Sequence, residues 1–166
     1  MKKIICILMV LLLCFSGCHL GRESQQNVQF YYLRNADNFV YGSSDGVVTY
    51  EERDATGYEQ DIRYLLTLYL QGPVDETLES PFPAGCKLKD ITLEADQISL
   101  LLNSNLTTLK GIDMTLACVC LAQTCFSMTN VQSVRIMAES FDGRIGVDQT
   151  IHINSLLLED LPQSSE

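Results

Sequence analysis

The cysteines carry the greatest potential for chemistry in this sequence, but their spacing does not predict a reactive site. Four lie after residue 18: Cys86, Cys118, Cys120 and Cys125. Within one helix, Cys118 and Cys125 would lie about 10.5 Å apart along the axis, which exceeds the Cα separation of about 7 Å that a disulfide allows. Cys120 would lie on the opposite side, and no neighbouring histidine completes a metal site. We expect buried free thiols, with one bridge through Cys86 or a metal site as the alternatives.

The histidines and serines are also isolated from catalytic partners. The chain has two histidines, His19 in a polar segment and His152 between two isoleucines. Ser80 and Ser99 have no histidine near them in the sequence, so the pattern does not predict a serine hydrolase. We therefore predict no catalytic residue, no metal ligand and no cofactor.

Five acidic residues gather where the first helix is expected to begin. They are Glu51, Glu52, Asp54, Glu59 and Asp61. Carboxylates at a helix N-terminus interact favourably with the helix dipole, so we expect solvated or capping roles. A calcium site is the alternative, although the spacing of an EF-hand loop is absent.

The overall charge narrows the class of partner. The 166-residue chain has a formal net charge of −10. A nucleic-acid-binding protein needs a basic surface that neutralises phosphates, and attraction to an anionic lipid surface also needs basic residues. We therefore expect no nucleic-acid partner.

The N-terminus has the pattern of an export signal. Lys2 and Lys3 precede an unbroken apolar run of 12 residues, Ile4–Phe15. This run is shorter than the roughly 20 residues that a transmembrane helix needs, and it is typical of a signal-peptide core. The run leads into Ser16, Gly17 and Cys18, which resembles a bacterial lipobox, whose cysteine is lipidated and becomes the new N-terminus. A plain signal peptide cut nearby and an uncleaved anchor are the alternatives.

This pattern divides the chain into four parts. We predict a lipoprotein signal peptide at 1–17, a lipidated cysteine with a flexible tether at 18–27, one domain at 28–158, and a polar tail at 159–166. The lipid on Cys18 would hold the domain at the extracytoplasmic face of the cell membrane.

Hydrophobic periodicity predicts the strands of the domain. Alternating apolar residues between turn signals indicate strands at Val28–Tyr32, Val47–Arg53, Lys87–Glu94, Gln97–Asn103 and Val131–Ala138, with short additions at Phe39–Gly42 and Ile151–Ile153. The third and fourth of these flank Ala95-Asp96, which predicts a tight hairpin.

Two helices complete the predicted fold. The first opens at a capping box, Thr56–Glu59, and ends at Gly72-Pro73, because glycine favours a left-handed cap and proline cannot continue the helix. The second lies within Thr108–Ser127 and is apolar on most sides, so it should be buried. The order β-β-α-β-β-α-β predicts an α+β two-layer sandwich, in which both helices cover one face of a small mixed or antiparallel sheet.

These elements carry a family resemblance. The sequence resembles the GerMN domain, which is named for sporulation and spore germination lipoproteins, in Leu65-Leu66, Gln71-Gly72-Pro73, Ser80-Pro81, Pro83, Gly85, Ile98-Ser99-Leu100, Val131, Val134, Ile136 and Asp142-Gly143. It departs from the family at Ala95-Asp96, where Asp-Gly is usual. The resemblance implies an extracytoplasmic, non-enzymatic module with a fold similar to ring-building motifs.

The favoured interpretation is therefore an interaction or assembly module of the cell envelope. Such a module would bind protein partners or assemble with further copies of itself. In this interpretation the motif residues have an architectural role, shaping a loop that forms a contact surface: Gly72, Pro73, Pro81, Pro83 and Gly85. The alternative is a lipoprotein that binds a ligand or a cell-wall fragment, which needs a concave pocket. We expect little room for such a pocket in this domain, and an enzyme is the third class considered.

Overall fold

The computed structural model describes residues 26–35 and 46–156. Its elements are β1 (Asn27–Arg34), β2 (Val48–Asp54), α2 (Ile62–Tyr69), β3 (Leu78–Glu79), β4 (Leu88–Glu94), β5 (Gln97–Leu102), η2 (Ser104–Thr108), α3 (Ile112–Met128), β6 (Ser133–Glu139), β7 (Ile145–His152) and α4 (Ile153–Leu156). The predicted signal peptide, Cys18, the strand at Phe39–Gly42 and the polar tail lie outside the described residues. Within these residues no helix is long and apolar enough to cross a membrane.

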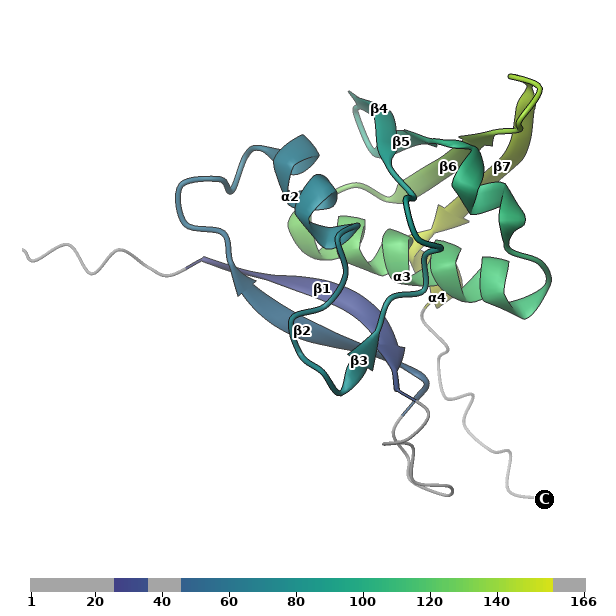
Figure 1. Cartoon of the computed structure of the whole chain (residues 1–166). Coiled ribbons are helices and arrows are strands. Elements are labelled where there is room, and N and C mark those ends of the chain that lie inside the picture. Colours follow the sequence, from purple (N-terminus) through teal and green to yellow (C-terminus); the bar gives the residue numbers. More distant parts are fainter. Residues whose placement is uncertain (1–25, 36–45, 157–166) are drawn as a thin grey trace, which may run out of the picture.

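The strands form two sheets with α3 between them (Figure 1). One sheet has the order β2-β1-β3, and the other has the order β4-β5-β6-β7. The predicted α+β class is confirmed, but the single sheet with two helices on one face is wrong. The reason lies in α3, which is buried on most sides, as predicted, and therefore needs apolar surface on more than one side.

The three-stranded sheet packs through the inward face of β1. Val28, Phe30 and Tyr32 alternate along the strand and are buried. Beyond the two-residue β3, the free edge of β1 is covered by α3, where Thr124 Oγ1 accepts a hydrogen bond from the Tyr31 N–H at 2.9 Å and Ser127 Oγ donates to the Gln29 carbonyl at 2.8 Å. These side chains satisfy backbone groups that would otherwise be buried without partners.

The four-stranded sheet contains the predicted β4–β5 hairpin. Its turn is at Ala95 and Asp96, and Ala95 adopts a positive φ of 38°. The chain then crosses over through α3, so β6 lies parallel to β5, and β7 returns antiparallel to β6. The core face of the two central strands is fully buried: Ile98, Leu100, Leu102, Val134, Ile136 and Ala138.

Two predicted boundaries are wrong. The edge strand expected at Ile151–Ile153 is the eight-residue β7, which ends at His152, and Ile153 begins α4. Half of the β7 residues are exposed and polar, and Gln149 interrupts the apolar alternation of Ile145, Val147 and Ile151. Helix α2 begins at Ile62 rather than at the capping box, because the Asp61 carboxylate caps it by accepting from the Tyr64 N–H at 2.9 Å.

Candidate functional site

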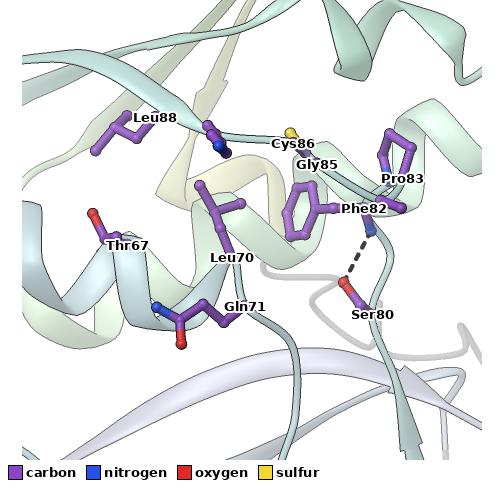
Figure 2. A pocket seen from close by; sticks show the side chains of 11 residues that line it. Thr67, Leu70, Gln71, Ser80, Phe82, Pro83, Gly85, Cys86 and Leu88 are labelled. Carbon is purple, nitrogen blue, oxygen red and sulfur yellow. Dashed lines mark hydrogen bonds between the residues drawn. The ribbon is translucent and has the colours of Figure 1, made fainter.

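A groove of about 740 Å³ lies beside α2 (Figure 2). It lies between the end of α2, the loop that follows β3 and the start of β4. Its lining residues are Thr67, Leu70, Gln71, Ser80, Phe82, Pro83, Ala84, Gly85, Cys86, Lys87 and Leu88. The expectation that this domain leaves little room for a pocket is therefore wrong.

Helix α2 forms one wall of the groove because its two sides differ in polarity. Leu65, Leu66 and Tyr69 are buried in the core. The residues that line the groove, Thr67, Leu70 and Gln71, belong to its other side and to the turn that follows it. Figure 2 shows the Leu70 side chain between this helix and the loop that carries Phe82.

The turn after α2 places Gly72 and Pro73, two of the predicted motif residues. Gly72 has a φ of +101°, which residues with a Cβ rarely adopt, and its N–H donates to the Tyr69 carbonyl at 3.1 Å. The Glu51 carboxylate from β2 accepts from the N–H groups of Val74 and Asp75, each at 3.0 Å. Glu51 is thus committed to holding this turn, not to the start of the helix.

The second wall is the loop of the other predicted motif residues. Pro81 is buried, Pro83 is half-buried, and the Pro83 carbonyl accepts from the Cys86 N–H at 3.1 Å. Gly85 has a φ of +78°, and a Cβ there would lie 2.8 Å from the Asn105 amide nitrogen. Glycine is therefore required by both the backbone conformation and the close approach of a side chain.

Two asparagines hold this loop from behind. Asn103 Nδ2 donates to the Gly85 carbonyl and Asn105 Nδ2 donates to the Ala84 carbonyl, both at 2.9 Å. Asn103 Oδ1 also accepts from the Lys87 N–H at 3.1 Å. The loop wall is consequently preformed, which lowers the entropic cost of binding at the groove.

The groove carries one charge. Lys87 is the only charged side chain among the described residues that line it, and it forms no salt bridge with any of them. The neighbouring cations are neutralised, since Lys89 pairs with Glu139 at 2.6 Å and Arg63 pairs with Asp90 at 3.0 Å. The groove therefore combines a largely neutral lining with one available ammonium group.

The four cysteines of the described region are buried and unpaired, as the favoured interpretation expects. Burial raises the pKa of the Cys86 and Cys120 thiols to about 12 and the pKa of the Cys118 thiol to about 11. Burial also raises the pKa of Cys125, which is fully enclosed. Because the thiolate is the reactive form, these thiols are poor nucleophiles and poor metal ligands near neutral pH.

The remaining candidates do not assemble into a reactive site. His152 is exposed at the end of β7, and Ser80 Oγ accepts from the Phe82 N–H at 3.3 Å within the groove loop. The acidic residues separate: Asp54 accepts from the Thr56 hydroxyl, and Glu59 accepts from the Gly57 N–H. Among residues 26–35 and 46–156, no group of three or more histidine, cysteine or acidic side chains could hold a metal ion. The arrangement is suited to binding.

Sequence reasoning missed three residues that build the site, Lys87, Asn103 and Asn105, and assigned Glu51 to the start of the helix instead of to the turn that follows it. The asparagines flank the end of β5 next to a loop rich in proline and glycine, and such loops need side-chain donors for their carbonyls. That need was a signal in the sequence. Nothing comparable marks Lys87, whose role depends on the pairing of its neighbours in space.

The comparisons with known proteins identify the family. The family model Germane, described as "Sporulation and spore germination", matches residues 29–141, which is more than half of the chain. The chain belongs to this family of sporulation and germination proteins. The match spans every groove-lining residue and confirms the resemblance inferred from the motifs. No curated protein matches the chain.

One solved structure supports the fold, and a second is also similar in part. The tandem GerMN domains of the sporulation protein GerM from Bacillus subtilis match with a TM-score of 0.50 at 14% identity, over 80% of this chain and 48% of that one. This chain therefore spans about half of the tandem. A candidate lipoprotein from Clostridium perfringens, determined at 2.5 Å, matches at 13% identity over 78% of this chain and 89% of that one, with a TM-score of 0.47.

Proposed function

We propose that this chain is a lipid-anchored, extracytoplasmic interaction module of the cell envelope that acts in spore formation or germination without catalysing a reaction. Cys18 would carry the lipid, and the domain would hold protein partners or further copies of itself. The groove beside α2 would be the docking surface. Membership of the sporulation and germination family supports the process, and the lipobox pattern supports the location.

The observation that carries this proposal is how the motif residues are used. Pro83 and Gly85 line an open groove, Gly72 forms the turn that follows its α2 wall, and their backbone bonds supply no reacting group. The four thiols of the described region are buried and have raised pKa values. A preformed concave surface without reactive groups is suited to recognition. The description of the Clostridium perfringens protein as a candidate lipoprotein fits the same placement.

The test is a crosslinking pull-down of the full chain from native membranes. We expect recovery of the chain itself or of one defined envelope protein, and loss of that partner in Cys18→Ala, which removes the lipid. Gln71→Trp, which fills the groove, should also abolish recovery. Its matched control is Gln60→Trp, at an exposed position before α2. A monomer with no reproducible neighbour would overturn the proposal.

The volume of the groove favours a second candidate, a lipoprotein that binds a small ligand or a cell-wall fragment. A volume of about 740 Å³ lies within the roughly 300–1,000 Å³ typical of small-molecule sites. Native mass spectrometry of the purified chain separates the two candidates. A bound small molecule that Gln71→Trp displaces would favour this one over a protein partner.

A further inference from the structure

We propose that the groove receives an extended, largely apolar segment of a partner protein that places a carboxylate against Lys87. This inference rests on the proposed function and names the chemistry of the partner. It follows from three properties of the same surface: the pairing of its charges, the polarity of its walls and its position at a sheet edge.

Among the three basic side chains around the groove, only Lys87 lacks a carboxylate partner in the described part of the chain. Arg63, Lys87 and Lys89 lie on α2 and around the start of β4, and two of them have carboxylate partners within the domain, Asp90 and Glu139. Lys87 has none among the described residues. A chain with a net charge of −10 repels anions over most of its surface. An unpaired lysine in the groove therefore selects where an acidic group can bind.

The polarity of the groove walls determines which other side chains the bound segment needs. Leu70, Phe82, Pro83 and Leu88 offer apolar contacts, while Thr67 and Gln71 form a polar strip on the α2 side (Figure 2). The side-chain amide of Gln71 makes no hydrogen bond to a described residue and is therefore available to bond a partner. An extended chain presents alternate side chains to opposite sides, so one segment can satisfy an apolar wall and a polar wall together.

Position favours a protein segment over a small molecule. The strand β4, which begins in the groove with Leu88, is the outermost strand of its sheet. Edge strands recruit extended segments through unpaired backbone groups. The groove is also open to solvent rather than closed, so a long chain can enter and leave it. A charge-assisted contact with Lys87 then fixes the register of that chain.

The experiment uses a zero-length carbodiimide on the full chain in native membranes. The reagent first adds to a carboxylate oxygen. The Lys87 amine then attacks the activated carbonyl carbon and forms an amide, and the reagent leaves as a urea that carries the former carboxylate oxygen. We expect mass spectrometry to find an amide between Lys87 and an aspartate or glutamate of another protein, within an apolar stretch. Lys87→Gln should abolish this product and reduce partner recovery at least fivefold. Lys87→Arg should retain recovery without the amide.

Lys110→Gln is the matched control, because Lys110 donates to the Thr107 carbonyl away from the groove. It should change neither the amide nor the recovery. Recovery that depends on Gln71→Trp but not on Lys87→Gln would overturn the carboxylate assignment and leave the docking proposal standing. An amide to a second copy of this chain, or a bound small acid, would overturn the assigned occupant. Recovery of no partner by any variant would overturn both proposals.

Discussion

The core side of α2 and the groove beside this helix differ in how completely their polar side chains are bonded. On the core side, Tyr69 stacks near Phe30 and Tyr32, with ring centroids 5.4 and 5.0 Å away, and its hydroxyl donates to the Tyr31 carbonyl at 2.7 Å. The Tyr69 carbonyl accepts from the Tyr32 hydroxyl at 2.9 Å. In the groove, the side-chain amide of Gln71 and the ammonium group of Lys87 have no bonded partner among the described residues.

This difference separates the structural role of the core side of α2 from the recognition role of the groove beside it. Buried polar groups must be paired because an unpaired one costs about 1–3 kcal/mol. An exposed groove carries no such requirement, so its unpaired groups remain available to a partner. The comparison predicts that changes on the core side alter stability, whereas changes on the groove side alter binding and leave stability nearly unchanged.

Alkaline pH should lower the free energy of unfolding more than any single substitution does. The raised pKa values of Cys86, Cys118 and Cys120, about 11 to 12, mean that the folded state keeps these thiols neutral. Their stabilisation is complete below the unfolded pKa of about 8.5 and is lost as the pH rises towards the folded pKa. Each thiol contributes a slope of about 1.4 kcal/mol per pH unit. Urea midpoints measured in reductant between pH 7 and 11 should fall steeply.

A variant sharpens this test. Cys120→Ala removes one of the titrating groups, so its midpoint should fall less steeply with pH than that of the parent chain. Return to pH 7 should restore the original midpoint. A midpoint that stays constant up to pH 11 would show that the thiols are not held neutral by burial.

Removing the ring of Tyr69 should give the largest effect of a substitution. Tyr69→Ala leaves a cavity between Phe30, Tyr32 and Phe82, and comparable truncations of buried aromatic residues cost about 3–5 kcal/mol. Urea denaturation measures the loss in the free energy of unfolding. The control is Tyr64→Ala on the exposed side of the same helix, where we expect less than about 1 kcal/mol. Equal losses for the two variants would remove the distinction between the sides.

Glu51→Gln should loosen the turn that separates the core from the groove. The variant loses the charge that binds Arg53 Nε at 2.7 Å and the N–H groups of Val74 and Asp75. Hydrogen bonds to charged groups contribute about 1.5–3 kcal/mol, so we expect a loss of about 2 kcal/mol in unfolding free energy. Glu52→Gln, on the exposed face of the same strand, should change it by less than about 0.5 kcal/mol. Similar effects at both positions would contradict this role.

Thr124→Val tests how α3 closes the edge of β1. The substitution keeps the side-chain shape but removes the oxygen of the fully buried Thr124 that accepts from the Tyr31 N–H at 2.9 Å. Leaving that donor unpaired should cost about 1–2 kcal/mol, measured by thermal or urea unfolding. Thr115→Val, at an exposed position on the same helix, is the control and should be nearly neutral. A neutral Thr124→Val would mean that another group satisfies this N–H.

The sequence predicts local structure better than it predicts the groove. Alternating residues such as Ile98, Leu100 and Leu102 identify β5, and the Gly72-Pro73 pair marks the end of α2, because these signals depend on neighbours in the chain. The division into two sheets is not local. The division depends on which surfaces cover α3. The apolar residues of α3 show that this helix is buried, but they do not identify the strands that pack against it.

The site shows the same limit. Gly85 was recognisable as a loop residue, whereas the reason that it must be glycine lies 20 positions away, in the amide of Asn105. Lys87 gains its significance from the salt bridges of Lys89 and Arg63, whose partners Glu139 and Asp90 come from different strands. Residues that act through such distant pairings cannot be found from spacing alone.

The smallest effect is expected at Ala95, and it provides a reference for the groove wall. Ala95 and Gly85 both adopt positive φ, 38° and 78°, but only one is glycine. A residue with a Cβ in this region costs about 1–2 kcal/mol, partly offset by the greater unfolded-state entropy of glycine. Ala95→Gly should therefore stabilise the fold by about 0.5–1 kcal/mol in urea denaturation, without changing partner recovery. Gly85→Ala should destabilise it and weaken recovery, because the added Cβ pushes on Asn105. Equal and opposite changes at the two positions, with partner recovery unchanged, would show that backbone conformation, and not the groove wall, sets the requirement for glycine.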